Sequence, residues 1–253
     1  MSEAEDLEIP EQKPCVSCGA SIDPNNKFCK NCGTRQSDED IHWLEKKWTL
    51  LKQASLFYLI YIGLCTLSRF TDTFKTIPWF LFLEVVLAGT AVIFFALNWA
   101  ENKQLLIWRN FSWQKLAAYA AIAITMAFLV HYSVNWLNIT VFSRDDHYYS
   151  IFAGSKGASF LIILCTAVTP ALFEELGFRG YLLQTLIKVT DKEQAVYISA
   201  FLFAIIHLSF VSLFWLIPFA LFIGYVRIKE NTLWYGVFFH FCFNLTACLF
   251  ELL

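Results

Sequence analysis

Apolar runs separated by short polar loops make up most of the chain after Leu50, whereas the residues before it are predominantly polar. A helix needs about 20 apolar residues, with a range of about 17–25, to cross a bilayer. The pattern predicts an all-α membrane protein built from such helices. Several runs are shorter than this range, so the predicted number of transmembrane helices is about seven to eight. The clearest spans are Ala54–Ser68, Pro78–Trp99, Leu116–Leu137, Gly157–Phe173, Ala195–His207, Val211–Val226 and Leu233–Leu252.

Two further segments are too short to span a membrane alone. Leu44–Lys52 is predicted to be a basic amphipathic lead-in to the first span, and Gly180–Val189 is expected to continue the fourth span toward the interface. The predicted domains are therefore residues 1–36, a polar head that starts with an acidic tail, residues 37–53, a linker with the lead-in, and residues 54–253, the membrane bundle.

The composition agrees with a membrane protein. Hydrophobic residues make up 57% of the chain and charged residues 16%, against about 45–50% and about 25% in soluble globular proteins. These values exclude a disordered protein and argue against an ordinary soluble enzyme. The net charge of −2 gives no reason to expect nucleic-acid binding, because such proteins generally carry a basic surface.

The polar head contains two CxxC pairs. Cys15, Cys18, Cys29 and Cys32 provide four thiolates at a spacing that suits one tetrahedral zinc ion. The pattern predicts a small zinc ribbon whose structural metal supplies most of its folding free energy. Two disulfides or a redox CxxC are the alternatives, but the sequence has no signal peptide and no local βαβ context. Structural zinc also indicates a reducing compartment, so the ribbon is expected in the cytoplasm.

The distribution of Lys and Arg independently predicts the same orientation. With the N-terminus inside and seven spans, most of the Lys and Arg residues in short loops lie on the inner side, as the positive-inside rule requires. We therefore expect a multi-pass protein of the bacterial inner or plasma membrane with a cytoplasmic ribbon. Residues 143–147, Ser-Arg-Asp-Asp-His, are expected on the outer side.

Ionisable residues inside predicted spans point to function, because each costs about 2.5–3.5 kcal/mol on insertion scales. In Glu174-Glu175-Leu-Gly-Phe-Arg179, the second glutamate and the arginine are four residues apart, so they share a helix face and can pair. Glu174 lies about 100° further round the helix and is less compensated, which suits a general base. The alternative is a polar helix end at the interface, with Arg179 snorkelling.

Two later spans carry further polar residues. His240 and Asn244 are also four residues apart on one helical face, so both can point into one cavity. The imidazole can donate a proton or bind a metal, and the amide can stabilise an oxyanion by donating a hydrogen bond. The alternative is a polar pair that holds two helices together. His207 ends an apolar run that includes Phe203, where a lone histidine could simply be interfacial. Glu84 lies near the start of a span without an evident partner, and it is either interfacial or faces the cavity.

Together these motifs, EExxxR, FxxxH and HxxxN in this order on successive spans, resemble those of the CAAX protease and bacteriocin-processing family of membrane endopeptidases. The resemblance covers about residues 157–244, and neither the first three spans nor the ribbon carries a family motif. It implies an intramembrane endopeptidase built as a helical bundle around a polar cavity. Its substrate would be a membrane-associated peptide or protein, with or without a lipid modification.

The resemblance also implies roles for individual residues. Glu174 and His207 would activate a water molecule, His240 and Asn244 would hold the oxyanion, and Glu175, Arg179 and Phe203 would support them. A metal version, with zinc bound by Glu174, His207 and His240, stays open, because the sequence has no HExxH motif to decide the matter.

Two other functions are compatible with the same residues. A non-catalytic scaffold or bacteriocin-immunity protein could keep the polar cavity, and a proton-coupled transporter could use the buried Glu and His residues as a relay. The absence of an inverted repeat of broken spans argues against the transporter. The ribbon is expected to bind a protein partner or a substrate, and the bilayer itself surrounds the bundle.

Overall fold

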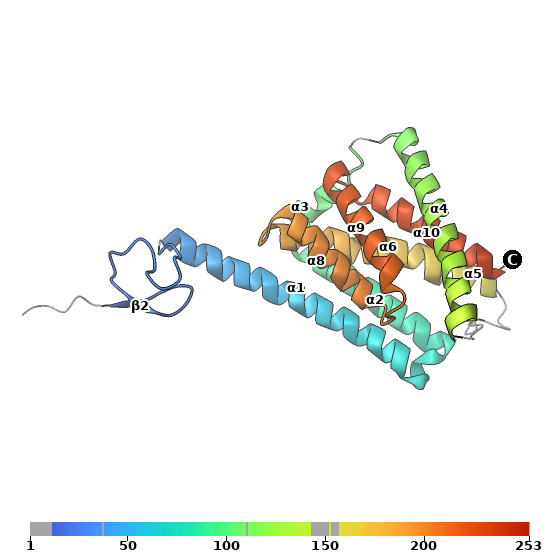
Figure 1. The fold of residues 1–253 in the computed structure, drawn as a ribbon, viewed down its shortest axis with the longest axis horizontal. Coiled ribbons are helices and arrows are strands. Elements are labelled where there is room, and N and C mark those ends of the chain that lie inside the picture. Colours follow the sequence, from blue (N-terminus) through green and yellow to red (C-terminus); the bar gives the residue numbers. More distant parts are fainter. Residues whose placement is uncertain (1–11, 37, 110, 143–151, 153–156, 253) are drawn as a thin grey trace, which may run out of the picture. The chain divides into compact units, whose positions relative to one another are not determined.

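The structure, a computed structural model, is mostly helical (Figure 1). It describes residues 12–36, 38–109, 111–142, 152 and 157–252. The predicted acidic tail and residues 143–147 lie outside the described residues. The chain divides into two compact units, Met1–Lys52 and Gln53–Leu253.

The first unit contains the cysteine-rich head. Strands β1 (Lys13–Pro14) and β2 (Ser21–Ile22) pair antiparallel. Gly19 and Gly33 adopt positive φ angles of 71° and 74°, a left-handed conformation that L side chains rarely adopt, at the turns after the two CxxC pairs. The buried residues around these turns are Cys15, Ile22 and Cys29, so this head has almost no apolar core of its own.

The chain continues into α1 (Asp38–Phe70), so the described part of the predicted linker and lead-in is helical. The remaining elements are η1 (Asp72–Lys75), α2 (Ile77–Leu97), α3 (Trp99–Asn102), η2 (Lys103–Leu106), α4 (Trp113–Leu137), η3 (Asn138–Phe142), α5 (Ala158–Ile163), η5 (Leu164–Val168), α6 (Thr169–Glu174), η6 (Glu175–Leu182), α7 (Leu183–Ile187), α8 (Lys192–Ile205), α9 (Leu213–Glu230) and α10 (Trp234–Leu252).

Four helical stretches of the described chain are long and apolar enough to cross a membrane: Trp43–Phe70, Ile77–Leu97, Trp113–Thr140 and Ala158–Ile187. A shorter apolar helix covers Trp234–Phe250. The other two predicted spans fall on α8 and α9, which do not meet that requirement. The predicted all-α polytopic membrane fold is confirmed, and the stretch through Ile187 shows that the fourth span does continue as predicted.

Aromatic packing joins α2 and η6 to the second half of α1. Phe57 contacts the rings of Tyr61, Phe94, Phe178 and Tyr181 at centroid distances of 4.9–5.6 Å. Elsewhere in this unit α4 packs along α10, and α8 packs along α9 (Figure 1). The aromatic cluster therefore holds η6, the segment that carries Glu175 and Arg179, firmly against α2.

Glycines allow the close approach of helices around η6. A Cβ atom added at Gly180 would lie 2.7 Å from Cε2 of the buried Phe95, and one at Gly177 would lie 2.9 Å from Cζ of Phe57. Small residues at helix contacts are a common device in membrane proteins, because they let backbones approach closely.

We predict that Gly180→Ala destabilises the bundle by about 1–3 kcal/mol, because the added methyl group overpacks a site without free volume. Chemical unfolding of the full chain in detergent measures the change. Gly89→Ala is the matched control: its Cβ would meet nothing within 4 Å, so its stability should stay within about 1 kcal/mol of wild type. Equal effects of the two substitutions would contradict this account of the packing.

Candidate functional site

The four cysteines of the head converge. Cys15 Sγ lies 3.6 Å from Cys32 Sγ, and Cys18 Sγ lies 3.7 Å from Cys29 Sγ. All four sulfur atoms lie within 4.8 Å of one another. Four thiolates about 2.3 Å from one zinc ion would be roughly 3.8 Å apart, whereas a disulfide bond measures about 2.05 Å. The cluster therefore fits a tetrahedral zinc ion and not a pair of disulfides.

Backbone N–H groups turn toward these sulfur atoms. Ser17 N donates to Cys15 Sγ, and Asn31 N donates to Cys29 Sγ, each at 3.4 Å. The backbone N–H of Cys18 is the main cause that lowers the pKa of the Cys15 thiol to about 6. A thiol with a lowered pKa is readily deprotonated at neutral pH, and the thiolate is the form that binds metal.

The first membrane motif lies on a helix that is interrupted just before it. η5 is a π-helical turn, and Pro170 follows at the start of α6. Proline has no N–H, so the carbonyl of Thr166, four residues earlier, lacks its regular helical donor. Asn244 Nδ2, from α10, donates to this carbonyl at 2.8 Å. This bond uses one of the two amide hydrogens of Asn244, and the second amide hydrogen takes no part in it.

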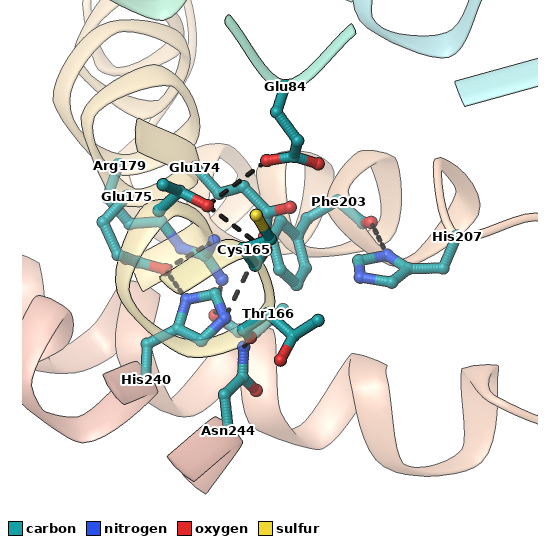
Figure 2. Close-up of polar contacts among 12 residues, drawn as sticks. Glu84, Cys165, Thr166, Glu174, Glu175, Arg179, Phe203, His207, His240 and Asn244 are labelled. Carbon is teal, nitrogen blue, oxygen red and sulfur yellow. Dashed lines mark hydrogen bonds and ion pairs between the residues drawn. The ribbon is translucent and has the colours of Figure 1, made fainter. Parts of the chain in front are cut away.

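A buried ion network lies immediately after this turn (Figure 2). Arg179 Nη1 is 3.1 Å from Glu175 Oε1, and both side chains are 1% exposed. His240 Nδ1 lies 3.0 Å from the same carboxylate oxygen. Because a carboxylate can only accept, Nδ1 carries the hydrogen in this contact. Arg179, Glu175 and His240 thus join η6 to α10 in the interior of the bundle.

Phe203 covers one side of the network. The Arg179 guanidinium carbon lies 4.2 Å from the centre of its ring, a distance at which a cation is attracted to the π face. The same ring contacts His207 and His240, with centroid distances of 5.0 and 6.2 Å. The FxxxH motif thus places its aromatic residue between the arginine and the two histidines.

Glu174 is positioned differently from its neighbour. Its Oε2 lies 3.9 Å from His240 Nε2, and its side chain is 23% exposed. It lines a cavity of about 590 Å³, together with His207 and Glu84. His240 and Asn244 are not on the described wall of this cavity. The remaining lining residues are Cys65, Ser68, Arg69, Lys75, Phe80, Leu83, Leu87, Ile206 and Leu208.

The tautomer of His207 follows from its hydrogen bond. His207 Nδ1 lies 3.0 Å from the carbonyl oxygen of Phe203. The carbonyl can only accept, so Nδ1 carries a hydrogen and Nε2 holds the lone pair in the neutral ring. The backbone of α8 therefore leaves Nε2 as the basic nitrogen of a side chain that lines the cavity.

Glu174, His207 and His240 do not form a preformed zinc site. In the part of the chain that the structure describes, only the four cysteines bring three or more ligand atoms of this kind within 4.8 Å of one another. The three membrane residues do not fit the open tetrahedral geometry of a catalytic zinc site. We therefore derive no chemical step through a metal in the bundle.

Comparison with known families agrees with the geometry. Residues 156–246 match the family model described as Type II CAAX prenyl endopeptidase Rce1-like. The chain carries an Rce1-like domain. Residues 15–36 match a zinc-ribbon domain. No curated protein and no solved structure is significantly similar to the chain.

These matches confirm the resemblance inferred from the three motifs, and they confirm the ribbon with its structural zinc. The Rce1-like domain and the apolar helices identify an integral membrane protein related to CAAX proteases. A protein of this kind has a bilayer around it and a peptide as its general class of substrate.

Sequence reasoning gave too little weight to two residues near the site. Glu84 faces the cavity, and its Oε2 lies 3.2 Å from Thr169 Oγ1. The sequence did point to Glu84, because a carboxylate inside an apolar span is costly and usually has a function. Nothing in the sequence indicated that its partner would be Thr169, which is 85 positions further along the chain.

We predict that Cys29→Ser in the full chain lowers bound zinc from about one ion per chain to nearly none, because one of the four ligands is lost. Metal analysis of the purified protein measures this. Cys242→Ser, which alters a half-buried cysteine outside the cluster, should leave the zinc content unchanged. Full zinc occupancy in Cys29→Ser would show that the four cysteines are not the site.

We predict that Arg179→Met destabilises the bundle by about 3–5 kcal/mol, because it leaves the Glu175 carboxylate buried without its cation. Chemical unfolding in detergent measures the loss. The double variant Glu175→Gln/Arg179→Met should lose less than Arg179→Met, since it removes both charges.

A second ion pair serves as the control for Arg179→Met. Lys188 pairs with Glu101 at 2.6 Å, and the glutamate side chain is 57% exposed. Lys188→Met should cost no more than about 1 kcal/mol, because solvent screens exposed pairs. If Arg179→Met costs no more than Lys188→Met, the network does not hold the bundle together.

Proposed function

We propose that the protein is an intramembrane endopeptidase that hydrolyses a peptide bond of a membrane-associated substrate with a water molecule activated by Glu174 and His207. The observation that carries this proposal is the split between two adjacent carboxylates. Glu175 is buried in an ion pair with Arg179, whereas Glu174 faces the cavity. A carboxylate that shares a cavity wall with the basic nitrogen of His207, in a space that water can enter, is what a general-base mechanism requires.

In the first step, a water molecule in the cavity loses a proton to Glu174 while its oxygen forms a bond to the carbonyl carbon of the substrate. His207 Nε2 orients the water by accepting its other hydrogen. The tetrahedral intermediate then collapses, the C–N bond breaks, and the proton on Glu174 passes to the leaving amine. The carboxylate is thereby regenerated for the next cycle.

His240 and Asn244 are the proposed oxyanion donors. His240 Nδ1 lies against Glu175, so the ring would donate to the oxyanion from Nε2. The amide hydrogen of Asn244 that Thr166 does not use supplies the second donor. Neither residue is on the described wall of the cavity, so the proposal requires that substrate binding bring the scissile carbonyl toward α10.

Glu175, Arg179 and Phe203 hold this arrangement without touching the substrate. The ion pair fixes η6, the guanidinium packs on the Phe203 ring, and Arg179 Nη2 donates to the carbonyl of Ala220 on α9 at 3.4 Å. Because three helices hold these side chains, the catalytic groups keep their positions, and such fixed positioning lowers the barrier of the reaction.

We also propose that the zinc ribbon lies on the cytoplasmic side of the membrane. The excess of Lys and Arg in the predicted inner loops supports a cytoplasmic ribbon in a bacterial inner or plasma membrane. There the ribbon would bind a protein partner or deliver a substrate to the bundle, and the substrate would be a peptide with or without a lipid chain.

We predict that Glu174→Gln lowers kcat by about 100-fold or more, the usual contribution of a general base. The assay uses the purified full chain in liposomes and a farnesylated peptide with a fluorophore and a quencher on either side of its cleavage site. His207→Ala should also lower kcat, because it removes the group that orients the water.

Glu193→Gln is the matched control, since Glu193 is exposed in the first turn of α8 and lies outside the cavity. It should cleave the peptide at the wild-type rate. Cleavage by Glu174→Gln at the rate of Glu193→Gln would rule out the proposed mechanism.

A further inference from the structure

Glu84 brings a third carboxyl group to the site. It lies on α2, whereas Glu174 lies at the end of α6, and both line the same cavity. Figure 2 shows Glu84 reaching in from its own helix toward the helix that carries Glu174. Three acidic groups, Glu84, Glu174 and Glu175, therefore share one small region of the bundle, although the proposed mechanism uses only the last two.

The hydrogen bonds of Thr169 bear on the state of Glu84. Thr169 Oγ1 lies 3.2 Å from the carbonyl oxygen of Cys165 and 3.2 Å from Glu84 Oε2. A hydroxyl group has only one hydrogen, so it cannot fully donate to both oxygens. If the hydrogen is directed to the carbonyl, the contact with Glu84 is a hydrogen bond only when the glutamate itself carries a proton.

Other threonines of the bundle indicate where that hydrogen goes. A helical threonine commonly donates to the carbonyl four residues earlier. The helical threonines of the bundle that donate in this way include Thr66, Thr90, Thr125, Thr166 and Thr246. Thr169 and Cys165 have the same spacing. If Thr169 donates its hydroxyl hydrogen to the Cys165 carbonyl, as these threonines do, its oxygen can only accept a hydrogen bond from Glu84.

The charges of the network point the same way. Arg179 already pairs with Glu175, whereas Glu84 and Glu174 both line the cavity. Two like charges in one cavity rarely ionise together. Of the two cations on the same wall, Lys75 pairs with Asp72 at 2.6 Å, and Arg69 can balance at most one of the two carboxylates.

We infer that Glu84 is a positioning residue that carries a proton in the working enzyme, donates it in a hydrogen bond to Thr169 Oγ1, and so leaves Glu174 as the ionised member of a carboxyl pair. The inference rests on the proposed endopeptidase function. Its proton stays on Glu84 through the cycle, so the transfer of the water proton to Glu174 and then to the leaving amine is unchanged.

The titratable and charged groups around Glu84 come from the elements that pack against α2 or line the cavity with it: Tyr61, Cys65 and Arg69 of α1, Lys75 of η1, Cys165 of η5, Glu174 of α6, Glu175 and Arg179 of η6, and His207 after α8. Activity that needs a protonated Glu84 falls as the pH rises through the ionisation of this group. Glu84→Gln is neutral at every pH, so its activity should extend to higher pH than that of wild type, in which the same neighbours titrate.

The test compares kcat against pH for wild type, Glu84→Gln and Glu193→Gln with the farnesylated peptide. On the acidic side, kcat of Glu84→Gln should stay within about threefold of wild type, whereas Glu174→Gln loses about 100-fold or more. The alkaline limb of Glu84→Gln should move to higher pH, and that of Glu193→Gln should coincide with wild type. A loss in Glu84→Gln as large as in Glu174→Gln, or an unmoved alkaline limb, would overturn the inference.

Infrared difference spectroscopy of the same full-length proteins tests whether Glu84 carries a proton, and it needs no substrate. A carboxylic acid C=O band that disappears on raising the pH should be present in wild type and in Glu193→Gln, and absent in Glu84→Gln. A spectrum of Glu84→Gln identical to wild type would overturn the inference. Because this readout needs no cleavage, it gives an answer even if the peptide assay disproves the endopeptidase.

Discussion

The ion pair between Glu175 and Arg179, closed by His240, is the interaction on which the rest of the bundle depends. Removing an ion from water costs several kcal/mol, so buried charges persist only when they are paired and hydrogen-bonded. Here one carboxylate oxygen lies 3.1 Å from an arginine on its own helix and 3.0 Å from a histidine on α10. This pairing neutralises Glu175 and leaves Glu174, one residue earlier, turned to the cavity, where we propose that it acts as the base.

The backbone around the pair is adapted to its position. Pro170 and the π-helical turns of η5 and η6 interrupt the regular hydrogen bonding of the helix, and Asn244 supplies the donor that the proline removes. Turns of this kind often mark functional sites. Gly177 and Gly180 let the same segment approach α2 closely.

Much of this architecture was predictable because local rules govern it. Apolar length predicted the membrane helices, and the spacing of four residues predicted that Glu175 and Arg179 would pair. Side-chain contacts between distant segments were not predictable. The approach of Glu84 to Thr169 depends on how α2 packs against α6, and the contact of Asn244 with the Thr166 carbonyl depends on the effect of Pro170. The roles of Glu174, His207, His240 and Asn244 in catalysis stay predictions.

The central claim is that Glu174 acts as a base on water and does not attack the substrate itself. A single turnover in water labelled with heavy oxygen, followed by mass spectrometry of both product and protein, tests it most directly. The account predicts that the label enters the new carboxylate of the product and that Glu174 stays unlabelled. Label in the Glu174 side chain would contradict it, because that result requires a covalent acyl-enzyme formed by the carboxylate.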